Sequence, residues 1–368
     1  MAVHSGFSEQ AVDIEFHYYM TYLIAARAGF SPGDALIVAQ SAQEIDDNHI
    51  PVSIDAGTNA AYENVISQTM NILHPHHNQK IYPIFHFIPG DPDAPGALRR
   101  DGVRNVWVTT PNSPLANQML DTALTSKNLY RIGASAHAFA DTWAHQNFIG
   151  RDDAGNEMPT GPLAERIEGK VALLRIGHAL AGHAPDIPGL VWKDDRLAQP
   201  TVDNTARFLD AAEHLLRKLC VVTKGTGHSD QTDRLAASLL TDLKEDIGPP
   251  STTAVRCNPV RIRRYQQRAL SRDYGGAPIP DYRPAQWADA AFIEKHGGLG
   301  ERLAKFVAQH TGLAGDILEF GARMPYSWQD PDNFRETHWY RFQEAVKSHL
   351  DECWGILVRQ FPELDVSA

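Results

Sequence analysis

Apolar residues along this chain recur mainly at the three- and four-residue spacing that is typical of amphipathic helices. Ser8 is expected to cap a first helix that runs to about residue 28 and ends at Gly29. Ser31 is expected to cap a second helix, with Pro32 at its first position and Asp46 near its end. Further helices are predicted to begin near residues 114 and 128 and to cover roughly residues 163–182, 202–222, 232–245, 286–295, 301–320 and 334–360.

Two stretches depart from this helical pattern. Residues 81–110 contain the apolar runs IYPIFHFIPG and NVWVTT around a Pro/Gly/Asp loop, which predicts short strands. Residues 248–284 form a long irregular insertion, which is a candidate lid or membrane-contact segment. The predicted fold is therefore mostly α with a minor β hairpin, and we expect residues 1–368 to form one domain.

One predicted helix carries a polar stripe on an otherwise apolar surface. The run ASAHAFADTWAHQNF places His137, Asp141 and His145 four residues apart, on one helix face. Such a stripe must be satisfied inside the fold by polar partners or by metal. His137 and His145 are about 12 Å apart along the helix axis, so ligand bonds of about 2 Å cannot join both to one ion. If the stripe binds metal, Asp141 is the natural bridge and more than one ion is implied.

Composition limits which partners and which kinds of metal or catalytic site the sequence can have. The formal net charge of −11 disfavours nucleic acid as a partner held by bulk electrostatics. Three scattered cysteines without a CxxC motif indicate neither a disulfide framework nor a thiolate zinc site, whereas 17 histidines favour nitrogen and oxygen ligands. The sequence contains no HExxH, Glu-x-x-His, His-Asp, G-x-S-x-G or glycine-rich phosphate-loop motif.

No targeting or membrane-spanning segment is recognisable. The run MAVHSGFSEQAVDIEF lacks the basic and apolar regions of a Sec signal peptide, and no window approaches 18 consecutive apolar residues. A cytoplasmic location is the default expectation, although export by a route other than Sec would leave the same pattern. The sequence leaves the oligomeric state open.

Further ligand candidates precede the stripe. His17 lies in DIEFHYYMTY, whose apolar neighbours predict burial, so it is either a packed core residue or a ligand. Asp46 and Asp47 end the second helix, where carboxylates oppose the helix macrodipole by roughly 0.3–1 kcal/mol each. These two carboxylates therefore either bind a cation or lie in a solvated turn. His86 alternates with two phenylalanines on a predicted strand and faces either a site or solvent.

A final group of candidates follows the stripe, in IGHALAGHAPDIP. This run presents His178, His183 and Asp186 from a backbone that prolines and a glycine fix. Two imidazoles and a carboxylate on a rigid turn suit a metal or a phosphate better than a packing role. The spacing does not rank His178 against His183.

Taken in order, the runs EFHYYMTYLIAARAGF, IDDN, FHFIPG, HAFADTWAHQNF and GHALAGHAPDIP resemble the zinc-dependent phospholipase C and P1-nuclease superfamily. They are most similar to its bacterial phosphatidylcholine-hydrolysing phospholipase C group of pseudomonads. The resemblance covers about the first half of the chain, to Trp192. It implies a multi-helix fold of that superfamily and a cluster of two or three zinc ions.

The resemblance also implies a ligand set. His17 would bind one ion, Asp47 or Asp46 with His86 and His137 a second, and Asp141 would bridge. A third ion would be bound by His145 with one or both of His178 and His183. This sequence departs from the superfamily pattern, which has a longer gap after the bridging aspartate and usually ends in a His-x-x-x-Glu pair. It also lacks the processed N-terminal tryptophan that the superfamily uses as a ligand. A version with two ions therefore also fits this sequence.

The implied activity is hydrolysis of a phosphodiester by a metal-activated water. A phosphatidylcholine-type phospholipid would yield diacylglycerol and a phosphorylated head group, with Asp47 or Asp46 orienting or deprotonating the water. Tyr18, Tyr19 and Trp143 are the candidate head-group contacts. The arginines of 248–284 either meet lipid phosphates at a membrane surface or lie in a solvated segment.

Three alternatives stay open. The first is a nuclease or another phosphodiesterase on the same scaffold. The negative net charge of the chain would then favour small substrates over long polyanions. A thiolate-free set of histidines and aspartates also permits a non-haem iron redox enzyme. A non-enzymatic protein stabilised by metal would instead have closed coordination without an exchangeable water.

Overall fold

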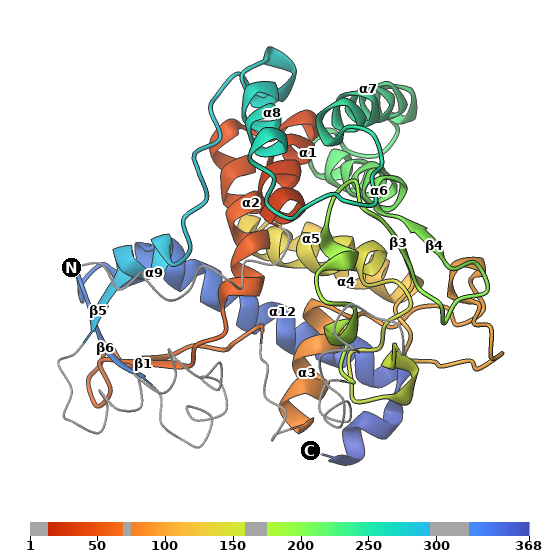
Figure 1. Ribbon diagram of the computed structural model, residues 1–368. Helices are drawn as coiled ribbons and strands as arrows, with labels where there is room; N and C mark the ends of the chain where they lie inside the picture. Colours follow the sequence, from red (N-terminus) through yellow and green to blue (C-terminus); the bar gives the residue numbers. More distant parts are fainter. Residues whose placement is uncertain (1–13, 69–74, 159–174, 295–323, 368) are drawn as a thin grey trace.

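The protein is mostly helical, which confirms the predicted class (Figure 1). The computed structural model describes residues 14–68, 75–158, 175–294 and 324–367. Helix α5 (Leu129–Ala144) runs through the middle of the molecule. The helices that pack around it include α2 (Pro32–Asp47), α4 (Pro114–Ser126), α6 (Asn204–Lys224) and α12 (His338–Gln360). Since α5 is buried from Tyr130 to Ala144, each polar side chain on it needs a partner inside the protein.

The first helices end and begin where the cap residues predict. A π-helix, η1 (Glu15–Met20), continues directly into α1 (Thr21–Ala28). Helix α1 ends at Gly29, whose φ of 109° lies in the left-handed region that favours glycine. The Ser31 side chain caps α2 by accepting a hydrogen bond from a backbone N–H three residues on. The expected start at Ser8 lies outside the described residues.

Helices α4 and α5 are likewise capped by Ser113 and Asn128, as their sequence signals predict. The helices predicted over 202–222, 232–245 and 334–360 correspond to α6, α7 and α12, although the last begins at His338. The helix expected at 301–320 and most of that at 163–182 lie outside the described residues, and residues 175–182 contain a 3-10 turn rather than an α-helix. The other described helices are α3 (Pro75–Phe85), α7 (Ser229–Ile247), α8 (Pro259–Ala269), α9 (Gln286–Ala291), η2 (Pro95–Ala97), η3 (Ala154–Asn156), η6 (Ala179–Ala181), η7 (Ala184–Asp186), η8 (Arg272–Tyr274), η9 (Phe334–Glu336) and η10 (Pro362–Ser367).

Two further predictions of local structure are wrong. Residues 81–85 belong to α3, and residues 108 and 109 form only isolated bridges, because a short apolar run does not distinguish a buried strand from a buried helix. The supposedly irregular segment 248–284 contains α8, capped by Asn258 with Pro259 at its first position. Arg261, Tyr265 and Ala269 form the buried face of α8, and the abundance of arginine hides this spacing in the sequence.

The β-structure is small and lies mainly at one side of the helices (Figure 1). One sheet has the order β2-β1-β6-β5, in which β1 and β6 are parallel and the other neighbours are antiparallel. Its strands are β1 (Val52–Ile54), β2 (Tyr62–Glu63), β5 (Phe292–Glu294) and β6 (Met324–Trp328). An antiparallel pair consists of β3 (Val191–Lys193) and β4 (Thr201–Asp203). Among the described residues, no helix is long and apolar enough to cross a membrane.

The close crossing of α2 and α5 yields a first test. A Cβ added at Gly133 would lie 2.3 Å from the Val38 carbonyl oxygen and 2.5 Å from the Ser41 Cβ. Alanine would gain about 1 kcal/mol in helix propensity, but overpacking of a rigid core costs about 1–3 kcal/mol. We therefore expect Gly133→Ala to lower the free energy of unfolding, measured by urea denaturation.

Gly33→Ala in the first turn of α2 is the matched control, because a Cβ there has no neighbour within 4 Å among the described residues. It should leave the unfolding free energy unchanged or raise it slightly. Equal effects of the two substitutions would contradict the close crossing.

Candidate metal centre

The polar stripe of α5 meets histidines from two other elements. Asp141 is buried, and its Oδ1 lies 3.1 Å from His17 Nε2. Its other oxygen, Oδ2, lies 3.1 Å from His137 Nε2 and 3.3 Å from His86 Nδ1. The two oxygens of one carboxylate thus face different histidines, which is the geometry of a carboxylate that can bridge two cations.

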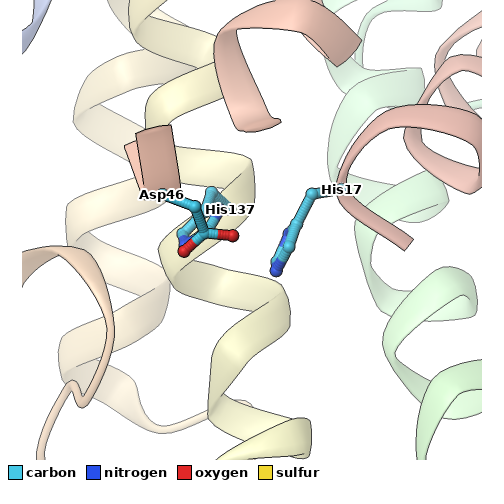
Figure 2. A group of neighbouring side chains, drawn as sticks. All are labelled: His17, Asp46 and His137. Atoms are coloured by element: carbon cyan, nitrogen blue, oxygen red, sulfur yellow. The ribbon is translucent and has the colours of Figure 1, made fainter. Parts of the chain in front are cut away.

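Asp46, at the end of α2, completes a group that we call the Asp46 cluster. Its Oδ1 lies 3.6 Å from His137 Nε2 and 3.8 Å from His86 Nδ1, and these two nitrogens are 3.2 Å apart. Figure 2 shows His17, Asp46 and His137 converging from η1, α2 and α5 on one space. Ligands bonded to a tetrahedral zinc at about 2.1 Å are about 3.4 Å from one another, so the spacing suits a metal ion. The Asp46 cluster consists of His17, Asp46, His86, His137 and Asp141.

A second group, the Asp186 cluster, consists of His145, His178 and Asp186. His145 Nε2 lies 3.3 Å from Asp186 Oδ1, and His178 Nε2 lies 3.7 Å from Asp186 Oδ2. The His145 and Asp186 side chains are almost fully buried, whereas that of His178 is 16% exposed. The cluster therefore approaches the surface at His178.

Backbone carbonyls fix the orientation of three of these imidazoles. His86 Nε2 donates to Ser67 O at 2.9 Å, His145 Nδ1 to His86 O at 2.8 Å, and His178 Nδ1 to Gly182 O at 2.8 Å. A carbonyl only accepts hydrogen bonds, so the bonded nitrogen carries the proton. In the neutral ring the opposite nitrogen would direct a lone pair toward a carboxylate, and a cation between the two atoms would make this contact favourable. Metal-ligating histidines commonly have this second hydrogen bond, so both clusters could hold a metal ion.

Electrostatics keep the carboxylates ionised despite burial. Burial alone would raise the pKa of Asp141, but the imidazoles of His145, His137 and His17 hold it well below its usual range. His178 and His145 lower the pKa of Asp186 in the same way, against the effect of burial. Burial and the neighbouring His17 lower the pKa of His137 to about 3, so this ring is neutral and available as a ligand.

Local structure explains how each ligand reaches its cluster. The π-helix η1 carries His17, and π-helical turns are frequent at functional sites. His86 follows the end of α3, where its backbone N–H still bonds to Tyr82 O, so its predicted alternation on a strand is wrong. Asp186 ends the short turn η7.

Two predicted ligands lie apart from the clusters. The Asp47 carboxylate accepts a hydrogen bond from the Tyr282 hydroxyl, and burial raises its pKa to about 6 against the effect of that bond. His183 is exposed, and both of its ring nitrogens lie 3.2 Å from Arg256 Nη1. Between the alternatives that the sequence leaves open, the structure brings Asp46 and His178 into the clusters, and Asp186 occupies the place expected for a second histidine.

The three predicted head-group contacts are buried. Tyr18 and Tyr19 are at most 2% exposed, and the Tyr18 hydroxyl donates to Pro280 O at 3.2 Å. Trp143 is 1% exposed, and its indole N–H donates to the Asp210 carboxylate. Two residues along α5 correspond to a rotation of about 200°, so Trp143 and Asp141 lie on opposite faces of the helix.

The sequence names Asp186 as a candidate in the run with His178 and His183, although the implied ligand set leaves it out. Two residues near the clusters have no such signal. Tyr282 and Arg261 lie more than two hundred residues from their partners Asp47 and Glu15, so no local pattern connects them. Asn258 and Pro259 are local signals for the start of α8, but not for these contacts.

The contrast between Asp46 and Asp47 provides a direct test. Asp46→Asn removes a carboxylate ligand, and we expect it to lose at least one equivalent of bound metal. Asp47→Asn keeps an oxygen that can accept the Tyr282 hydrogen bond, so we expect it to retain the full metal content. Metal is measured by mass spectrometry on untagged protein, and circular dichroism confirms folding. A greater loss of metal in Asp47→Asn would contradict the assignment.

Comparison with known proteins gives a family without an assigned activity. The model of a family described as a family of unknown function (DUF6765) matches residues 12–357, which include all members of both clusters. No curated protein and no solved structure matches the chain. The match extends over nearly the whole sequence, so the chain belongs to the DUF6765 family.

Proposed function

We propose that this protein is a zinc-dependent phosphodiester hydrolase of the phospholipase C type. The observation that carries the proposal is the Asp141 carboxylate, which turns one oxygen to His17 and the other to His86 and His137. Carboxylate-bridged ions at about 3.5–4 Å are a recurrent device of enzymes that cleave phosphate esters. The sequence resemblance to zinc-dependent phospholipases C, carried by the runs that contain these residues, supports the same chemistry.

The described side chains suit three metal positions of unequal completeness. Asp46, His86, His137 and Asp141 Oδ2 would hold one ion with four protein ligands. His145, His178 and Asp186 would hold a second with three. His17 Nε2 and Asp141 Oδ1 would supply two ligands to a third. Three-ligand and two-ligand positions leave room for water and substrate, which is the mark of catalytic rather than structural sites.

When bound, divalent ions supply a water of lowered pKa and neutralise the charge of phosphoryl oxygens. The residues of the chain then have distinct roles. Asp46 faces the cluster with one oxygen and would orient the attacking water by accepting its proton or hydrogen bond. His178 is the most exposed ligand side chain of the two clusters, so substrate would approach from its side. Arg256 contacts His183, which lies three residues before Asp186. It would therefore place a positive charge near the side from which substrate approaches.

Phospholipid is the favoured substrate class, and a soluble phosphodiester is the alternative. The net charge of −11 disfavours long polyanions. Several arginines of 248–284 make contacts inside the protein: Arg256, Arg261, Arg264 and Arg268. Membrane contact by this segment would therefore depend mainly on its remaining arginines, Arg263, Arg272 and Arg283, which are exposed.

The decisive experiment combines metal content with hydrolysis by wild type and Asp141→Asn. We expect two or three zinc ions per chain in wild type and hydrolysis of phosphatidylcholine vesicles or of a soluble phosphodiester. The Asn variant should lose metal and about a thousandfold or more of activity, because the ions supply several kcal/mol of transition-state stabilisation. A matched control is Asp210→Asn, whose carboxylate also contacts α5 but lies outside both clusters.

Each outcome of this experiment has a defined meaning. Full activity in Asp141→Asn would refute the proposal, and stoichiometric iron with oxygen-dependent turnover would replace it by a redox enzyme. The burial of the Asp46 cluster favours one further candidate, a protein that metal stabilises without catalysis. Bound zinc with no hydrolysis of lipid, soluble ester or nucleotide diester would support that candidate.

A further inference from the structure

One segment of the second half of the chain contacts the immediate neighbours of two ligands. Glu15, two residues before His17, is fully buried and accepts from Arg261 Nε at 2.6 Å and Nη2 at 2.7 Å. The backbone N–H of Asn258 donates to the same carboxylate at 3.0 Å. The first residue of η1 is thus held by a bidentate, almost fully buried ion pair with α8.

Tyr282 lies between the two ligand-bearing elements. Its hydroxyl donates to the carboxylate of Asp47, the residue after Asp46. Its ring packs edge-on against Tyr18, the residue after His17, with 5.1 Å between ring centroids. Tyr282 therefore contacts the neighbours of both ligands.

The opposite side of this segment is attached to α7. Arg268 bonds to the carboxylates of Asp242, Glu245 and Asp246, and the Tyr274 hydroxyl donates to Asp242 at 2.7 Å. We name residues 255–282 the clamp segment. Arg261 and Tyr282 lie toward the residues beside the metal ligands, whereas Arg268 and Tyr274 bond to carboxylates of α7.

We propose that the clamp segment positions His17 and Asp46 for metal binding, with Arg261 and Tyr282 as positioning residues. The inference rests on the metal centre of the proposed function, but not on hydrolysis. Its physical basis is the short distance along the chain: the residues that the clamp segment contacts lie one or two positions from His17 and Asp46. A π-helix is rare and persists where surrounding contacts favour it, so the contacts at Glu15 and Tyr18 also stabilise the turn that aims His17.

Coupling of this kind acts in both directions. If docking of the clamp segment raises metal affinity, metal binding must stabilise the docked segment by the same free energy. Removal of metal should therefore increase hydrogen exchange in 255–282 more than in the first half of α7, which contacts neither cluster.

Two isosteric substitutions test the proposal. Tyr282 and Tyr274 belong to the same segment, and substitution of either by Phe removes one partly buried hydrogen bond from tyrosine to aspartate. Only Tyr282 contacts the neighbours of the ligands. We expect Tyr282→Phe to weaken zinc affinity by about 10–100-fold, the usual effect of removing support from metal ligands, and Tyr274→Phe to leave it within about twofold. Affinity is measured on the full chain by competition with a chromophoric chelator, and the visible spectrum of the cobalt-substituted protein reports ligand geometry.

Arg261→Gln and Arg268→Gln form a second pair with the same logic. Arg261→Gln should reduce zinc affinity and alter the cobalt spectrum, whereas Arg268→Gln should lower the melting temperature alone. Arg261→Gln could fail to fold because Glu15 then lacks its ion pair. In that case the comparison of Tyr282→Phe with Tyr274→Phe tests the proposal. Equal zinc affinities and equal cobalt spectra in Tyr282→Phe and Tyr274→Phe would overturn the proposal. Loss of hydrolysis is not a criterion, so a protein that binds zinc without catalysis would refute the proposed function and leave the clamp intact.

Discussion

A carboxylate buried among imidazoles at the centre of the molecule is the constraint on which the rest of the structure depends. Asp141 is 1% exposed, and an ionised carboxylate in such a position costs several kcal/mol unless positive charge surrounds it. Four imidazoles surround it, and three of them lie within 3.3 Å of its oxygens. Neutral imidazoles alone do not balance this charge, so protons or metal ions must complete the site.

Close packing of helices makes this arrangement attainable. The residues of α5 between its polar positions are mainly alanines, and Gly133 lets α2 approach without a side chain between the backbones. The approach brings Asp46, at the end of α2, within reach of the α5 histidine His137. Small residues therefore set the distance between the two helices at which the short side chain of Asp46 reaches His137.

The sequence predicts the part of the site that lies on one helix and leaves open the parts that depend on tertiary contacts. His137, Asp141 and His145 follow from four-residue spacing alone, and the caps at Ser31 and Asn128 place the ends of α2 and α5. The choice between Asp46 and Asp47 depends on the rotation of α2 about its axis at its last turn, which no local pattern specifies. The strand predicted around His86 failed because a buried apolar run is equally consistent with the end of a helix.

The two clusters are joined by His145, which lies close to a carboxylate of each. Its Nδ1 lies 3.4 Å from Asp141 Oδ2, while its Nε2 lies 3.3 Å from Asp186 Oδ1. Both carboxylates raise the pKa of His145 to about 9, although burial lowers it, so the ring holds a proton tightly where no metal binds. An ion at the Asp186 cluster would displace that proton and deliver positive charge toward Asp141 through the same ring. Metal binding at the more exposed cluster would thus be electrostatically coupled to metal binding at the buried one.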